Sequence, residues 1–117
     1  VGNIMSYVPQ SRADLATATP YTLSADHTTS ETEILRCEAD LHIVLNSAPK
    51  DRETIVMYLA TANTVQITGD IRIYSAALYN IAQFNIDEFG GSTLTFNTQH
   101  ATAHLMYVRD FGEWLAI

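Results

Sequence analysis

Hydrophobic and polar residues alternate over much of the chain after residue 32, in short segments rich in β-branched and aromatic side chains. These segments recur at intervals of about ten residues with turn-forming residues between them, which is the pattern of an all-β sandwich or barrel. The pattern predicts strands at residues 33–37, 41–45, 54–59, 64–67, 71–74, 92–96, 103–109 and 114–117.

Turn chemistry predicts how some of these strands pair. Residues 68–70 read Thr-Gly-Asp, and Gly before Asp suits the positive φ of a tight turn, so we expect residues 64–67 and 71–74 to form a hairpin. Residues 103–109 and 114–117 predict a final hairpin around Gly112. Residues 54–59 are an almost continuous apolar run, which is typical of a strand covered on both faces.

Two stretches do not follow the alternating pattern. Residues 1–30 are rich in Ser, Thr, Ala and Asp around Pro9 and Pro20, and they predict either an extended arm that reaches a neighbouring subunit or an edge strand packed on its own domain. Residues 75–89 are interpreted as loop with one short strand around Phe84 and Ile86. We therefore divide the chain into an N-terminal arm at 1–30 and a β domain at 31–117.

The expected fold is an antiparallel, jelly-roll-like β-sandwich with that arm. A length of 117 residues suits one domain, and 47% hydrophobic residues against 16% charged ones exclude a disordered protein. We expect the single cysteine, Cys37, to be buried. The side chains expected to hold the fold are Val56, Tyr58, Val65, Ile67, Ile73, Leu94, Phe96, Leu105, Tyr107 and Trp114.

The net charge of −7 argues against two classes of partner, nucleic acids and acidic membrane surfaces. Nucleic-acid binding needs clustered cations, and the six Lys and Arg residues are scattered along the sequence. No apolar run approaches the roughly 18 to 20 residues that span a bilayer, and the N-terminus lacks the order of a signal peptide. We expect no nucleic-acid partner and no membrane insertion.

The sequence predicts no catalytic centre, metal site or cofactor. His100 and His104 have the spacing of zinc ligands on a helix, but on a strand they would lie about 13 Å apart and could share a metal only around a threefold axis. The acidic groups at residues 31–40 and 87–88 could supply paired carboxylates for glycoside hydrolysis, although solvated loop charges are the simpler interpretation. Neither a nucleophile elbow nor a phosphate-binding glycine loop is present.

Three aromatic residues are candidates for ligand or partner binding. Tyr79, Phe89 and Phe111 fall in or beside predicted loops, where an exposed ring can stack on a sugar or fill a pocket on a partner. Most of the other aromatic residues in the predicted strands and loops are expected in the core.

The order of segments from residue 41 onward resembles the small β domains of tailed-bacteriophage virion proteins, which include tail fibres, needle knobs and head-decoration proteins. The resemblance lies in residues 41–46 followed by Ala48-Pro49, in residues 54–58 and 64–69, and in the closing segments 91–96 and 111–117, where a Gly precedes a terminal Trp strand. It covers about two thirds of the chain in short matches. It implies a homotrimer that cements a capsid or caps a fibre or needle and touches the host surface.

On these grounds the expected function is that of a non-enzymatic structural component of a bacteriophage virion, located in the virion and partnered by copies of itself and by other virion proteins. One alternative is an attachment domain that binds host-surface carbohydrate through aromatic residues in loops. A second alternative is a small hydrolase that holds acidic residues in a cleft.

Overall fold

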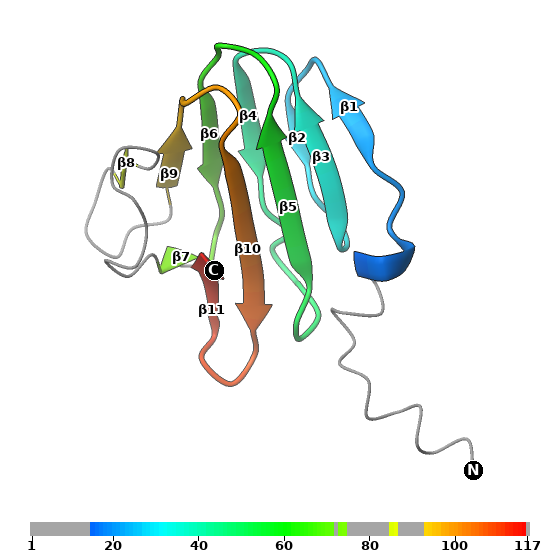
Figure 1. Ribbon diagram of the computed structural model, residues 1–117. Coiled ribbons are helices and arrows are strands. Elements are labelled where there is room, and N and C mark those ends of the chain that lie inside the picture. The colour runs from blue at the N-terminus through cyan, green and yellow to red at the C-terminus, as the bar shows by residue number, and fades with distance from the viewer. Residues whose placement is uncertain (1–14, 72, 75–84, 87–92, 117) are drawn as a thin grey trace.

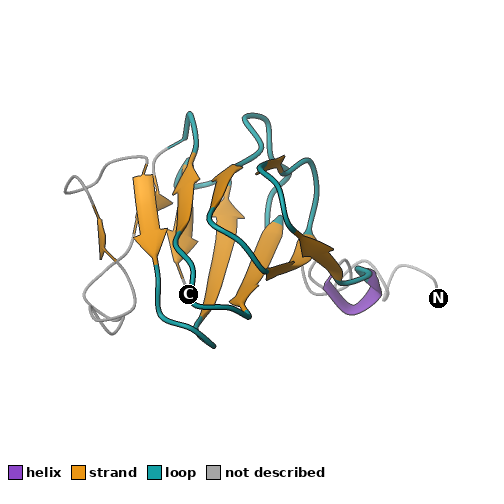
Figure 2. Cartoon of the chain, turned by 90° about the horizontal axis from the view of Figure 1, so that it is seen from above, coloured by secondary structure: helices purple, strands orange, loops and turns teal. Residues whose placement is uncertain are grey.

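The computed structural model describes residues 15–71, 73–74, 85–86 and 93–116, and the regular secondary structure in this part of the chain is almost entirely β-strand (Figure 1). One helical turn at residues 15–17 precedes the strands and lies at the edge of the domain (Figure 2). The strands are β1 (Tyr21–Leu23), β2 (His27–Thr28), β3 (Glu33–Cys37), β4 (Leu41–Val44), β5 (Thr54–Leu59), β6 (Val65–Thr68), β7 (Ile73–Tyr74), β8 (Asn85–Ile86), β9 (Thr93–Phe96), β10 (Thr102–Val108) and β11 (Glu113–Ala116).

The strands form two sheets, and the chain alternates between them from β1 to β7. The six-stranded sheet has the order β1-β3-β5-β10-β11-β7, and the five-stranded sheet has the order β2-β4-β6-β9-β8. Each pass through β1 and β2, β3 and β4, or β5 and β6 therefore makes one turn of a roll. Successive turns stack in parallel, with Leu35 opposite Met57 in one sheet and Ile43 opposite Ile67 in the other.

The last strands close this roll with antiparallel pairing. β10 lies antiparallel to both β5 and β11, and β9 lies antiparallel to both β6 and β8. The β10–β11 connection is the final hairpin predicted from the sequence, and Gly112 takes the positive φ of 64° in it. This confirms the final pair of strands.

The β class is confirmed, whereas the predicted antiparallel arrangement is wrong for five of the nine ladders among the described residues, which are parallel. The predicted hairpin of residues 64–67 and 71–74 is also wrong. β6 pairs with β4 and β9 in one sheet, whereas β7 pairs in parallel with β11 in the other. Gly69 does not adopt a positive φ, so the chain crosses between the sheets there instead of reversing.

The N-terminal part of the described chain belongs to the roll. β1 is an edge strand that pairs in parallel with β3, so of the two interpretations of this stretch the structure has the edge strand on its own domain at residues 21–23. Residues 1–14 of the expected arm lie outside the described residues. No helix in the described ranges has the length and hydrophobicity needed to cross a membrane.

Side chains from both sheets form one hydrophobic core. Burial alternates along the longer strands, because successive side chains of a strand point to opposite faces of the sheet. Cys37 is buried as expected. Val56 and Tyr58 were expected in the core, but they are only partly buried, so β5 is not covered on both faces. The largest fully buried residues are Leu35, Ile43, Leu45, Ile55, Met57, Leu59, Val65, Ile67, Leu94, Leu105 and Trp114.

Candidate interaction surface

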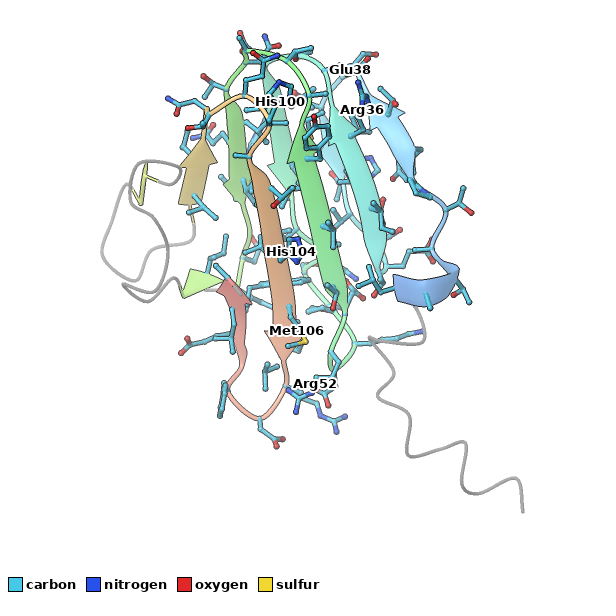
Figure 3. The ribbon with its side chains drawn as sticks, in the orientation of Figure 1. Arg36, Glu38, Arg52, His100, His104 and Met106 are labelled. Atoms are coloured by element: carbon cyan, nitrogen blue, oxygen red, sulfur yellow. The ribbon has the colours of Figure 1, made fainter. Side chains whose placement is uncertain are left out.

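The six-stranded sheet presents an outward face that consists mainly of apolar and neutral side chains. Because Leu35, Met57 and Leu105 point into the core, the alternate positions of their strands point outward. We call this surface the outer face, and Figure 3 views it with three of its residues, Arg36, His104 and Met106, labelled. Its solvent-accessible members include Ile34, Arg36, Val56, Tyr58, Thr102, His104, Met106, Glu113 and Leu115.

Strand register places the apolar members of the outer face in adjoining rows. Val56 lies between Ile34 on β3 and His104 on β10. In the next row, Met106 lies opposite Leu115 on β11. Ile34, Val56, Met106 and Leu115 are all partly buried, whereas His104 is exposed. Directly opposed side chains on one face of a sheet are in contact range, and Val56 is the diagonal neighbour of Met106, so the four apolar residues form one strip beside His104.

One end of the outer face is held by a small aromatic and cationic cluster. The Tyr58 hydroxyl lies 2.8 Å from Nδ1 of His100, and the two rings are stacked with centroids 6.1 Å apart. The Arg36 guanidinium lies 5.6 Å from the Tyr58 ring centroid, and its Nε donates to Glu38 at 2.8 Å. The hydrogen bond to Glu38 raises the pKa of Arg36. These contacts fix the orientation of the Tyr58 ring.

The outer face carries few charges, although the chain as a whole is acidic. Each described carboxylate lies in a loop or turn or at the first residue of a strand, as Glu33 and Glu113 do. Arg36 and Glu113 are the formally charged residues of the outer face. Glu113 lies at its edge, opposite Val108 where β10 ends, and the partner of Arg36, Glu38, lies just beyond the end of β3. The middle of the outer face is therefore free of carboxylates.

Of the three aromatic residues predicted to bind a ligand or partner, the structure describes one. Phe111 lies in the turn between β10 and β11 and is 65% exposed. Tyr79 and Phe89 lie outside the described residues. The outer face itself was not predicted as a site, although alternate positions of β3, β5 and β10 already give Ile34, Val56 and Met106 in the sequence.

The two histidines with zinc-like spacing have different surroundings. His100 has a positive φ of 71° just before β10 and contacts Tyr58, whereas His104 points outward from the middle of β10. Within the described ranges, no three His, Cys, Asp or Glu side chains are grouped so that they could hold a metal ion.

The acidic residues of segment 31–40 separate to the two ends of β3. Glu31 and Glu33 lie where β3 begins, whereas Glu38 and Asp40 follow its end. Asp40 accepts hydrogen bonds from the Thr64 backbone N–H at 2.8 Å and from the Asn63 amide at 3.2 Å, and these bonds lower its pKa. Residues 87–88 lie outside the described part. The carboxylates at the two ends therefore do not form one catalytic pair.

No protein-family model matches this chain, and no curated protein matches it in sequence at a significant level. What the chain does therefore has to be inferred from its own residues.

Proposed function

We propose that this domain is a non-enzymatic structural component that works as a homotrimer, and that the outer face of the six-stranded sheet is the contact between subunits. One observation carries the proposal: an apolar strip without carboxylates crosses β3, β5, β10 and β11 of an otherwise acidic protein. The proposal includes a sandwich arrangement, with one core between two sheets.

The chemistry of the outer face suits a contact between copies of one chain. Two copies of an acidic protein repel each other wherever carboxylates meet, so association is least opposed at a surface that lacks them. The buried centres of protein interfaces are depleted of charged residues and enriched in aromatic residues and Met. Tyr58 and Met106 supply those side chains.

Assembly would also stabilise a small domain. A chain of this length buries only about two thirds of its unfolded surface when it folds alone. Covering Val56, Met106 and Leu115 with a second copy would bury further apolar area, and binding to the folded state alone increases its stability. The threefold number and the location in a bacteriophage virion rest on the sequence resemblance.

The test is the solution mass, measured by light scattering over a dilution series, for the parent chain and two variants. His104→Glu puts a carboxylate in the middle of the outer face at an exposed position, where it should leave the isolated subunit folded. Gln66→Glu is the matched control, because Gln66 is also exposed but projects outward from β6 in the five-stranded sheet. We expect a threefold mass for the parent and for Gln66→Glu, and a single-chain mass for His104→Glu.

A parent chain that is monomeric at every concentration would refute the proposal. A threefold mass that survives in His104→Glu would show that subunits meet through another surface. Circular dichroism of each variant confirms that a change in mass does not result from unfolding.

A carbohydrate-binding attachment domain is the second candidate, and the exposure of Phe111 favours it. An aromatic ring that is 65% exposed at the tip of a hairpin can stack on the apolar face of a sugar. This role would be supported if the parent chain binds a glycan array and Phe111→Ala loses that binding while its melting temperature is unchanged. A Phe111→Ala variant that retains full glycan binding would exclude this ring as the binding platform.

A further inference from the structure

A cavity of about 550 Å³ opens where β1, β3 and β5 begin, away from the centre of the outer face. Its walls come from three separate segments: residues 17–19 with Tyr21, residues 30–33, and Lys50 with Glu53. The volume lies in the range of sites that bind small molecules. The parallel roll brings these segments together, because strands that run in the same direction begin at the same end of a sheet.

The walls of the cavity are polar and predominantly anionic. They carry the carboxylates of Glu31, Glu33 and Glu53 against one ammonium group, that of Lys50. The hydroxyl groups lining the cavity belong to Thr17, Thr19, Tyr21, Ser30 and Thr32. A ligand that complements these walls therefore needs a positive charge for the carboxylates and several hydrogen-bonding groups for the hydroxyls.

Glu53 is a buried carboxylate that forms no ion pair with the described residues, although the Lys50 ammonium group lines the same cavity. It is 4% exposed, and it accepts hydrogen bonds from the Asn46 amide at 3.1 Å and from the Lys50 backbone N–H at 3.3 Å. Both donors are neutral, and within the described ranges no Lys, Arg or His nitrogen forms an ion pair with Glu53. A buried charge is normally balanced by an opposite charge in direct contact, so a cationic group in the cavity would supply the ion pair that the described residues do not form with Glu53.

Glu33 and Tyr21 form a second rigid part of the wall. Glu33 is 6% exposed and accepts hydrogen bonds from the Ser30 backbone N–H at 3.0 Å and from the Tyr21 hydroxyl. Nε2 of His27 lies 2.8 Å from the same carboxylate. These contacts hold the Tyr21 ring at the cavity while leaving it 40% exposed, so one aromatic surface is fixed before a ligand enters.

We infer that this cavity binds a small organic cation that also carries hydroxyl groups, the chemical class of amino alcohols and amino sugars. The ammonium group of the ligand contacts Glu53 and Glu31, and its hydroxyl groups exchange hydrogen bonds with the Ser and Thr side chains of the wall. The Tyr21 ring lies beside the ligand and adds a cation–π attraction. The inference does not depend on trimer formation.

Glucosamine is the probe, titrated into the complete ¹⁵N-labelled chain while the amide signals of Ser30, Thr32 and Lys50 are followed. Glucose is the matched control ligand, because it keeps the ring and hydroxyl groups but has no amine. Calcium chloride tests whether an inorganic cation binds in place of the amine. We expect saturable shifts with glucosamine, together with no response to glucose or to calcium.

Three variants assign the response to the cavity. Glu53→Gln and Glu31→Gln each remove one negative charge at constant size, and we expect each to weaken glucosamine binding about tenfold, the effect of losing one hydrogen bond to a charged group. Glu31 is exposed, so its variant remains informative if Glu53→Gln fails to fold. Glu38→Gln is the control, because Glu38 lies beyond the opposite end of β3 and should leave binding unchanged.

Three results would overturn the inference. The first is the absence of any shift at the wall residues with glucosamine at tens of millimolar, which is far above the range of a specific site. The second is an equal response to glucose, which would remove the role of the charge. The third is saturation by calcium with no response to glucosamine, which would make the cavity an inorganic cation site.

Discussion

Arg52 and Gly112 share the same left-handed backbone conformation, with φ values of 67° and 64°, in two turns at the same end of the six-stranded sheet. Arg52 precedes β5, and its backbone N–H donates to the Tyr107 carbonyl at 2.7 Å. Gly112 lies between β10 and β11, and its N–H donates to the Val108 carbonyl at 2.9 Å. One turn therefore uses a glycine for a conformation that the other imposes on an arginine.

This relationship predicts opposite effects of two substitutions. In the left-handed conformation a residue with a Cβ destabilises the fold by roughly 1–2 kcal/mol. Glycine avoids this strain, but it loses more conformational entropy on folding, which offsets part of the advantage. Arg52→Gly should therefore raise the free energy of unfolding by about 0.5–1 kcal/mol, and Gly112→Ala should lower it by about 1 kcal/mol. Apart from the adjoining residues, no atom lies within 4 Å of a Cβ built at Gly112, so the destabilisation by Gly112→Ala comes from the backbone conformation alone. Urea denaturation measures both, and changes of equal sign would contradict the explanation.

The sequence predicted where most strands lie but not how they pair. The bounds of β3 and β5 match the predicted segments 33–37 and 54–59, because alternation or a continuous apolar run identifies a strand locally. Alternation does not specify which sheet a strand joins or the direction of its neighbour. The Thr-Gly-Asp at residues 68–70 therefore resembled a hairpin turn, although the chain passes there from one sheet to the other.

The two candidate sites also depend on strand pairing, which alternation in the sequence does not specify. The outward residues of β3, β5 and β10 were available from alternation, but their assembly into one strip depends on β10 returning to lie beside β5. The cavity joins Tyr21, Glu33 and Glu53 through parallel stacking of turns with different lengths. Long-range pairing of this kind leaves no local signal in a single sequence, so neither site could be predicted from spacing.

Cys37 should react slowly with alkylating reagents while the chain is folded. Burial raises the pKa of its thiol from 9.0 to about 11, and the side chain is 0% exposed. Two pKa units reduce the reactive thiolate about a hundredfold. We expect iodoacetamide at pH 8 to label the native chain at least about a hundred times more slowly than the chain in guanidinium chloride. Similar rates in the two states would mean that this part of the core opens readily.

The direction of the Cys37 shift also predicts how alkali affects stability. The folded state disfavours the thiolate, so the protonated thiol contributes its full stability below pH 9, and this contribution decreases as the pH rises from 9 toward 11. Replacing Cys37 with Ala removes this titration while retaining a small apolar side chain. Between pH 8 and pH 11 the melting temperature should therefore fall less steeply for Cys37→Ala than for the parent. Equal slopes of melting temperature against pH would contradict the assignment.

Asp40 should contribute to unfolding in acid. Its hydrogen bonds from the Thr64 N–H and the Asn63 amide lower its pKa in the folded state. The stability it supplies is therefore present above the unfolded pKa of about 3.9 and is lost as the pH falls through the lower folded value. Asp40→Asn should flatten the dependence of melting temperature on pH below about 4. Asp110→Asn is the control, because no hydrogen bond or ion pair of this carboxylate is found in the described part of the chain. An unchanged slope in Asp40→Asn would reject this role.

Glu33→Gln should loosen the first turn of the roll. The buried carboxylate joins three consecutive parts of the chain through Tyr21 on β1, His27 on β2 and the Ser30 backbone N–H. A glutamine amide offers one oxygen and one NH₂ group where the carboxylate offers two acceptors, so at least one donor loses its partner at a cost of about 2–3 kcal/mol. Hydrogen exchange should therefore accelerate at residues 21–23 and 27–28 more than in β5 or β10. Glu31→Gln, at an exposed neighbouring position, should change neither exchange nor melting. Uniform acceleration across all strands would show instead that Glu33 supports the whole fold and not the first turn, because local opening would then have no lower free energy than global unfolding.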